Sequence, residues 1–374
     1  MITKDKENLQ FRILYFIGII LIVANHAGNG SISLVYEWFP AYSFHIGLFV
    51  FASGYFFIKN RDTKILDFIK KIVIKFLIPL FAWNFVYGLL VVFLSQFGYH
   101  LGNTFNFKTL FLTPLYNGHQ FSFNLASWFL FPLFVIQLIN IFIVKLINKR
   151  EKLYYVYFII SLLLGFLGVI IAINGYYKGF YLLLVKVLYF LPFFSLGILY
   201  RLKLEKYDKL SNLLYFGILF LITLISIYAF GGIKKYTPAL CNDFDNFYRP
   251  FLTGFLGIAF WLRVSKILVP SIGNSKFVKI ISKNTFAIMM HQFLGFFLLN
   301  TLFYWVFKIF KIYNRFDEFL YKNKIYYFYL PKNLKQFYLL YVVAGIGVSL
   351  LISYGLRKLK NKIKSKYKIV KKTD

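Results

Sequence analysis

Two histidines lie close together in the chain, each inside an apolar run. His26 stands near the end of one run, in IVANHAGNG, and His45 near the start of the next, in FHIGLFVFASGYFF. Imidazole exchanges protons near neutral pH, so such a pair could supply a general base and the partner that orients it, or a nucleophile. The alternative is that both rings simply reach water at the boundary of the apolar region.

Later runs carry further polar side chains in apolar surroundings, where an ionisable or amide group is a functional candidate. Lys186 could line a polar cavity or extend its flexible chain to water. Arg249 closes a loop that also holds Asp243 and Asp245, which could pair with it. Interfacial tryptophans are common, so Trp128 has a purely structural alternative. The candidates outside the first two runs are Asn84, Trp128, Lys186, Arg249 and His291, the last without an assigned role.

The sequence does not favour catalysis by carboxylates, or a disulfide or metal site built from cysteines. The apolar runs contain no Asp or Glu, which argues against a carboxylate proton relay and against a paired-carboxylate hydrolase. The single cysteine, Cys241, excludes an intramolecular disulfide and a cysteine metal cage, and we predict no metal site.

These residues must be positioned by membrane-spanning helices. The chain has 374 residues, of which 59% are hydrophobic and 22% aromatic, and a soluble core of this size could not hide so much apolar surface. We therefore expect an all-α, polytopic membrane protein with about ten spans. They are Phe11–Ala27, Ser43–Ile58, Ile72–Gln96, Leu125–Leu146, Tyr154–Ile173, Phe180–Tyr200, Leu213–Phe230, Phe247–Leu268, Thr285–Phe307 and Phe337–Leu356.

The positive charge predicts the orientation of these spans. The net charge is +31, but the basic residues form short clusters between the runs, which does not indicate nucleic-acid binding. If the chain starts in the cytoplasm, 31 of the 44 basic residues face it, so both termini are predicted to be cytoplasmic. The loop Lys308 to Lys335 is also basic but would lie on the outer side, so it fits this orientation least well. We expect it to be an interfacial helix or a surface for an anionic glycan.

We expect one membrane domain over residues 1–374. Residues 1–10 form a cytoplasmic leader, 11–356 a ten-helix bundle and 357–374 a basic cytoplasmic tail. Nothing in the sequence indicates an oligomeric state.

The order and spacing of several motifs resemble the bacterial membrane acyltransferase family called acyltransferase 3, and in particular its fucose O-acetylase-like branch. The resemblance covers nearly the whole chain. It rests on a first span ending in His26 and on the segments FHIGLFVFASGYFF, KKIVIKFLIPLF, SWFLFPLF, LPFFSLGILY and NTFAIMMHQF.

The resemblance implies that His26 is central to acyl transfer, and that His45, Ser53 and Gly54 belong to the segment that builds the second span. The family pattern has an arginine eleven residues before the histidine, where this chain has Tyr15. Arg12 lies one turn further back. At about 100° per residue both share the helix face of His26.

The hypothesis is an O-acyltransferase of the bacterial cytoplasmic membrane, with acyl-CoA, commonly acetyl-CoA, as donor and a polysaccharide or lipid-linked glycan as acceptor. The donor's phosphates would be held by Arg12, Lys70, Lys71 and Lys75. Tyr15, Ser53 and Gly54 would also belong to the acyl-CoA site. His26 would be the base or would be transiently acylated, and His45 would orient it or take over as proton acceptor. Asn84, Trp128, Lys186 or Arg249 would serve the acceptor or the oxyanion.

Membrane lipid is the expected surrounding partner. The rival of a different class is a glycan exporter or transporter built on the same bundle, and a third alternative is a non-catalytic scaffold. The presence of both histidines favours the enzyme.

Overall fold

The computed structural model describes residues 7–28, 38–116, 121–310 and 316–373, and it is all-helical over these ranges. No β-strand occurs in the described chain; the one isolated β-bridge joins Gly102 and Phe121. Ten helices are long and apolar enough to cross a membrane. The predicted all-α, polytopic membrane architecture is thus confirmed.

The elements follow one another closely along the chain. The spans are built on α1 Leu9–His26, α2 Ala41–Phe57, α4 Ile78–Ser95, α6 Leu130–Ile147, α7 Leu153–Ile173, α8 Phe180–Leu199, α9 Asn212–Phe230, α10 Arg249–Ile267, α13 Thr285–Phe310 and α15 Tyr338–Thr373. Shorter helices are α3 Ile65–Ile72, α5 Thr113–Tyr116, α11 Val269–Ile272, α12 Lys276–Lys283 and α14 Glu318–Asn323.

Two spans begin differently from the sequence prediction. The third starts at Ile65 with the amphipathic helix α3 and passes through a π-helical turn, Val73–Leu77, into α4. The fourth begins with a 3₁₀ segment, Ser122–Phe129, that leads into α6. Hydropathy alone does not show the backbone geometry of these two segments.

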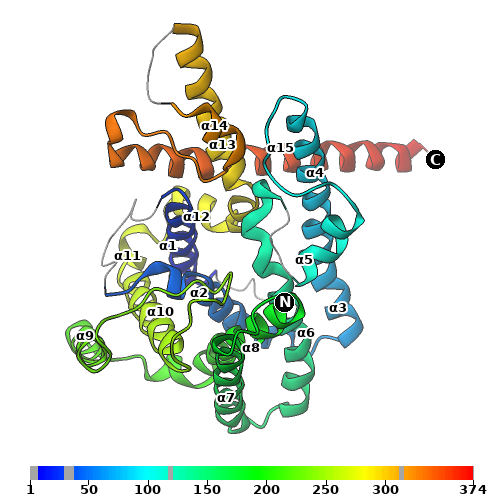
Figure 1. Cartoon of the computed structure of the whole chain (residues 1–374). Helices are drawn as coiled ribbons and strands as arrows, with labels where there is room; N and C mark the ends of the chain where they lie inside the picture. Colours follow the sequence, from blue (N-terminus) through cyan, green and yellow to red (C-terminus); the bar gives the residue numbers. More distant parts are fainter. Residues whose placement is uncertain (1–6, 29–37, 117–120, 311–315, 374) are drawn as a thin grey trace.

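Helices α1, α2 and α8 form the centre of the bundle, and α1 also contacts α10, α12, α13 and α15 (Figure 1). In the spans that contain α2 and α8, the protein buries 78% of the most apolar stretch. In α9 it buries only 17%. An apolar helix that remains mostly uncovered by protein fits a lipid surface, so α9 lies at the periphery.

Glycines allow the closest helix crossing in this centre. A Cβ on Gly54 of α2 would lie 2.0 Å from the carbonyl oxygen of Phe194, and a Cβ on Gly197 of α8 would lie 2.0 Å from that of Phe51. Small residues at such crossings let two backbones approach and pack in a membrane. Helices α2 and α8 therefore make one tightly packed pair.

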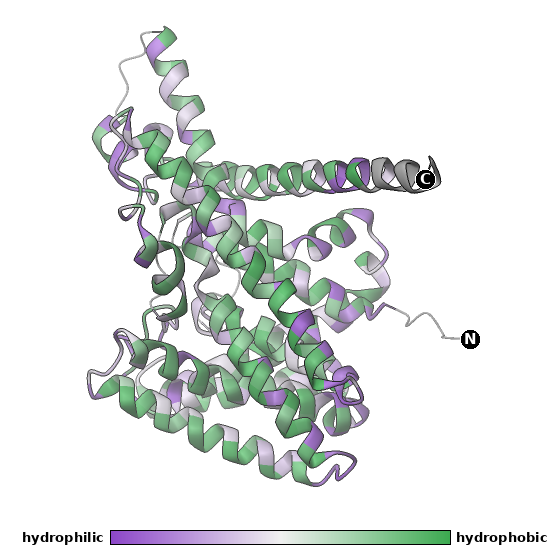
Figure 2. Cartoon of the chain, turned by 90° about the vertical axis from the view of Figure 1, so that its right-hand side faces the viewer, coloured by the Kyte–Doolittle hydropathy of each residue, from purple (hydrophilic) through white to green (hydrophobic). Residues whose placement is uncertain are grey.

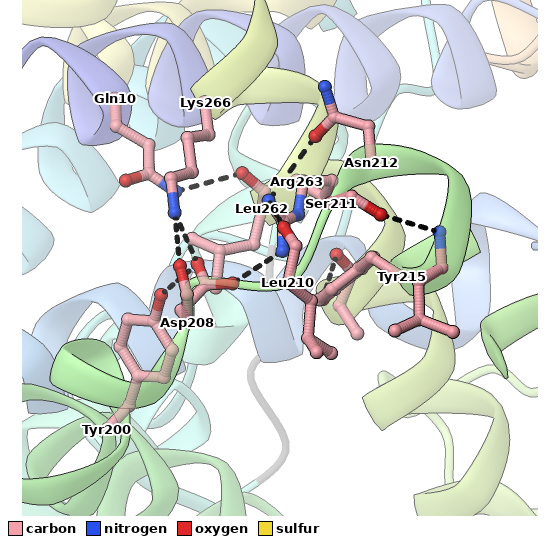
Figure 3. A network of polar contacts seen from close by, with 12 residues as sticks. Gln10, Tyr200, Asp208, Leu210, Ser211, Asn212, Tyr215, Leu262, Arg263 and Lys266 are labelled. Atoms are coloured by element: carbon pink, nitrogen blue, oxygen red, sulfur yellow. Dashed lines mark hydrogen bonds and ion pairs between the residues drawn. The ribbon is translucent and has the colours of Figure 1, made fainter. Parts of the chain in front are cut away.

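The basic connections gather at the end of the bundle where α1 begins. Lys203 pairs with Glu151 at 2.5 Å, and Lys145 donates to the carbonyl of Arg61 at 3.1 Å. Asp208, after α8, accepts from Arg263 at 2.6 Å and pairs with Lys266 at 3.1 Å, both on α10 (Figure 3). We call this end, where the predicted cytoplasmic loops meet, the basic end.

Figure 3 also shows how α1 joins this network. Gln10 donates its side-chain amide to the carbonyl of Leu262 at 2.9 Å, and Tyr200 donates to Asp208 at 3.1 Å. The start of α1 is thereby fastened to α10 on one side, while α8 and α10 share one carboxylate. These contacts fix the axial position of α1.

The last helix extends well beyond its apolar part. Helix α15 has 36 residues, about 54 Å at 1.5 Å per residue, which exceeds the hydrocarbon core. The helix projects past the neighbouring helices, and its projecting part carries both hydrophilic and hydrophobic residues (Figure 2). The basic tail begins as a helical continuation of the span.

The basic loop after α13 is not the interfacial helix we expected. Its residues 311–315 lie outside the described part. The described rest contains the six-residue α14, an irregular segment and the short 3₁₀ turns Pro331–Asn333 and Lys335–Phe337. Tyr341 of α15 donates to Asn300 of α13 at 2.5 Å and accepts from the backbone N–H of Tyr329 at 2.7 Å. Buried hydroxyls need such partners, and these hold the segment against α13 and α15.

Candidate active site

One face of α1 lines three neighbouring cavities. The lining residues are spaced three or four apart, which places them on one helix face. They are Arg12, Tyr15, Ile19, Ile22 and His26. From Arg12 to His26 this face covers about 21 Å along the helix axis, at 1.5 Å per residue.

The first cavity, the basic cavity, has a volume of about 360 Å³ and lies at the basic end. Four cationic side chains line it, Arg12, Lys59, Arg201 and Lys283, together with the carboxylate of Glu7. Several cations around one opening suit a ligand with several phosphate groups, since guanidinium and ammonium groups form charge-assisted hydrogen bonds with phosphate oxygens.

Glu7 occupies part of this cationic site. Its carboxylate accepts from Arg12 Nη2 at 2.5 Å and lies 3.6 Å from Lys283 Nζ. The hydrogen bond from Arg12 lowers the pKa of Glu7 below its ordinary value. Arg12 also donates to the carbonyl of Gly273 at 2.7 Å, so its guanidinium is held at the mouth of the cavity.

Tyr55 organises the other wall of the basic cavity. Its ring stacks on Phe11 with 3.9 Å between centroids, and its hydroxyl donates to Glu205 at 2.8 Å. Arg201 donates to the same hydroxyl at 2.6 Å and pairs with Glu205 at 3.1 Å. The guanidinium of Arg201 is thus fixed by a carboxylate and a phenol while still lining the cavity.

The middle cavity, of about 170 Å³, continues from the basic cavity, and Tyr15 lines both. Ser53 and Lys75 contribute polar groups, and most of the remaining lining is apolar, as in Ile19 and Phe76. A narrow passage with few polar groups suits a long, thin and uncharged chain better than a phosphate.

The third cavity, of about 30 Å³, contains both histidines, and we call it the histidine cavity. It shares Ile22, Phe129 and Met289 with the middle cavity, so these two cavities are direct neighbours. The volume holds one or two water molecules. A reacting group reaching it from the basic end would meet His26.

His26 is oriented by Gln292 of α13. Its Nδ1 lies 3.0 Å from Gln292 Oε1, and Phe293 packs against the ring at 5.1 Å between centroids. An amide oxygen only accepts, so Nδ1 carries the proton and Nε2 keeps its lone pair. Gln292 is itself buried and donates to the carbonyl of Met289 at 3.2 Å. His26 Nε2 is therefore the basic nitrogen.

Among the described contacts, the hydrogen-bond partner of His26 is Gln292 and not His45. His45 Nδ1 lies 2.5 Å from the carbonyl of Ala41, one turn earlier in its own helix. Both rings line the histidine cavity, and Tyr42 packs edge-on against His45. A backbone acceptor within the same helix satisfies His45 locally, which leaves the ring in the cavity wall rather than behind His26.

Trp128 also lines the histidine cavity, and its ring contacts Lys186. The Lys186 ammonium is 4.7 Å from the centre of the Trp128 ring, a cation–π contact. Lys186 is 2% exposed although it lies within α8. These two candidates, from distant parts of the chain, are brought together beside the histidines.

Most of the other residues predicted to bind the donor make contacts outside the cavities. Lys70 and Lys71 do not line the three cavities in the described chain; Lys71 donates to Asn60 at 3.0 Å, and both lie on the exposed face of α3. Of this cluster only Lys75 reaches a cavity, the middle one. Gly54 serves the α2 and α8 crossing rather than a donor.

The remaining three candidates do not line the histidine cavity in the described chain. Asn84 is fully buried and donates to the carbonyls of Thr109 and Leu110, so it fastens a loop to α4. Arg249 pairs with Asp245 at 2.9 Å, the structural alternative considered above. His291 accepts from or donates to the Tyr87 hydroxyl at 2.6 Å and packs against Trp83.

Sequence reasoning missed several site residues. Gln292 directly follows His291, and its spacing from Met289 and Thr285 would have placed it on one face of α13. Lys59, Arg201 and Lys283 each stand at the end of an apolar run, where the positive-inside pattern accounts for them without any further role. No local signal distinguishes such a lysine from one that lines a cavity.

Comparison with known proteins gives one match. Residues 10–358 match the family model Acyl_transf_3, described as an acyltransferase domain. No curated protein and no solved structure matches the chain significantly.

Proposed function

Because the chain belongs to the acyltransferase 3 family of multi-pass membrane acyltransferases, we propose that it moves an acyl group, most simply acetyl, from acyl-CoA to a glycan hydroxyl. The acceptor would be a cell-surface polysaccharide or a lipid-linked glycan. The protein would lie in the bacterial cytoplasmic membrane, with the basic end and both termini in the cytoplasm.

The observation that carries this proposal is the row of cavities along α1. The basic cavity would hold the donor's phosphates through Arg12, Lys59, Arg201 and Lys283. The middle cavity would take the thin pantetheine arm past Tyr15 and Ser53. The thioester would then lie beside His26, about 21 Å along the helix from Arg12.

His26 would act as general base. The acceptor hydroxyl gives its proton to Nε2 while its oxygen attacks the thioester carbonyl, forming a tetrahedral oxyanion. Collapse of this intermediate breaks the carbon–sulfur bond, and the departing CoA thiolate takes the proton from His26. The hydrogen bond from Nδ1 to Gln292 holds the ring so that Nε2 is the nitrogen that takes and returns the proton.

The Trp128 indole is the polar group we propose for the oxyanion, since it lines the same cavity. Asn84, which we expected in this role, is committed to two backbone carbonyls. His45 remains in the cavity wall and would contact the acceptor.

The experiment is mass spectrometry of surface glycan from a deletion strain complemented with wild type, His26→Ala or His100→Ala. His100 is exposed and lies outside the three cavities in the described chain, so it is the matched control. We expect the acyl mass to return with wild type and His100→Ala only, since positioned bases contribute about 10²- to 10⁴-fold.

Two other outcomes would contradict the proposal. If His26→Ala restored acylation fully, the catalytic assignment would be wrong. If the deletion left acylation intact and instead stopped glycan reaching the surface, the exporter alternative would hold.

A further inference from the structure

Lys186 differs from the other buried cations of this protein. Arg12 and Arg263 are each at most 9% exposed, and each pairs with a carboxylate, Glu7 or Asp208. Lys186 is 2% exposed, yet within the described residues no Asp or Glu forms an ion pair with it. Burying a charge without a counter-charge is costly, so a partner for this ammonium is expected.

Lys186 lies beside the histidine cavity, where the acceptor would react. Its ammonium lies against Trp128, which lines the histidine cavity. On the same side, Thr237, Pro238 and Ala239 line the cavity, and Lys235 lies over the Tyr42 ring at 4.2 Å. Two cations therefore pack on the Trp128 and Tyr42 rings, which line one cavity that has no acidic residue in its lining.

The acidic residues of the loop that follows Lys235 already have hydrogen-bond or ion-pair partners. Asp243 accepts from the backbone N–H of Thr237 at 2.6 Å. Asp245 pairs with Lys234 at 2.7 Å and with Arg249 at 2.9 Å, and it accepts from Tyr236. These contacts hold the loop in place, and neither carboxylate forms an ion pair with Lys186 in the described structure.

The donor does not supply the missing anion either. In the function proposed above, the phosphates of acyl-CoA remain in the basic cavity, at the other end of the lining face of α1. That face is about 21 Å long, far more than the roughly 4 Å at which an ion pair forms. An anion that meets Lys186 must come with the acceptor.

We propose, on the basis of that function, that Lys186 binds a negatively charged oxygen group of the acceptor, so that the glycan is acidic near the acylated hydroxyl. The group is a carboxylate of a sugar acid or a phosphate of a phosphorylated or lipid-linked sugar. Lys186 contacts the acceptor and sets specificity, while His26 carries the proton.

The test uses purified full-length protein in nanodiscs, radiolabelled acetyl-CoA and glycan extracted from the deletion strain. The glycan is used intact, after chemical reduction of its carboxylates to alcohols, or after removal of its phosphates with hydrofluoric acid. We expect one of the two treatments to lower transfer at least about tenfold, the value of one charge-assisted hydrogen bond. The treatment that does so identifies the anion.

The variants are Lys186→Met, Lys186→Arg and the control Lys178→Met, an exposed lysine just before α8. Lys186→Met should lower transfer to intact glycan about tenfold and leave transfer to the neutralised glycan unchanged. Lys186→Arg should retain the preference, and Lys178→Met should behave as wild type. Stabilisation of each variant by the donor alone shows that it is folded.

Three results would overturn the inference. If neither treatment lowered transfer, the acceptor would be neutral and only the proposed function would stand. If Lys186→Met lowered transfer to intact and neutralised glycan equally, Lys186 would act on the reacting carbonyl instead. If the wild-type protein acylated no glycan, the proposed function itself would fail, and this inference with it.

Discussion

Nδ1 of His26, at the end of α1, lies 3.0 Å from Oε1 of Gln292 on α13, although 266 positions separate them in the chain. This contact determines which nitrogen of the imidazole faces the cavity. It also joins the central helix to a helix from the other half of the protein. The first prediction follows from it.

Replacing Gln292 with Ala should lower kcat about 10²-fold and leave the KM for acyl-CoA unchanged. The ring would lose its only orienting acceptor among the described contacts, and misplacement of a base by about 1 Å has this order of effect. Gln292→Glu keeps an accepting oxygen at the same position and should retain more activity than Gln292→Ala. A raised KM with normal kcat would instead assign Gln292 to donor binding.

Lys283 and Glu7 should affect donor binding in opposite directions. Lys283→Ala removes a cation from the basic cavity and should raise the KM for acyl-CoA several-fold. Glu7→Gln removes the carboxylate that competes for Arg12 and Lys283, and it should lower this KM. Steady-state kinetics at constant salt measures both, with Lys178→Met as control. Equal KM values in all four proteins would contradict donor binding in this cavity.

Acid should abolish the contribution of Glu7 to stability. The pKa of Glu7 is lowered in the folded protein by the hydrogen bond from Arg12. A depressed carboxyl pKa stabilises the fold above the ordinary value of 4.5, and this stabilisation is lost as the pH falls through the folded pKa. The Tm of Glu7→Gln should therefore be below that of wild type near neutral pH and converge with it in acid. A constant difference at every pH would show that the ion pair is not responsible.

Gly54→Ala should destabilise the protein rather than weaken donor binding. The new Cβ would lie 2.0 Å from the Phe194 carbonyl, so α2 and α8 would have to separate, which typically costs about 1–3 kcal/mol. Ser53→Ala, one residue earlier, removes a hydroxyl from the middle cavity without a clash and serves as control. Thermal unfolding in detergent should show a lower Tm for Gly54→Ala only. A normal Tm with a raised KM would restore the donor-binding role that the sequence suggested.

Much of the architecture was predictable because it depends on local properties. Hydropathy over about twenty residues identifies a span, since a helix must bury its backbone polar groups within itself in lipid. Helical periodicity likewise put Arg12, Tyr15 and His26 on one face of the first span, and the structure places all three along cavities. The family could be recognised from motif order and is confirmed over residues 10–358.

The choice among polar candidates was not predictable in the same way. Asn84 and His26 are both polar residues in apolar helices, and only the packing of distant segments shows that one binds loop carbonyls while the other faces a cavity. Pairings such as His26 with Gln292, or Lys186 with Trp128, join residues far apart in the chain. Composition and period determined that this is a helical membrane protein with a histidine at the end of its first span. Tertiary structure alone decided which side chains surround that histidine, because contacts between helices depend on how all ten pack together.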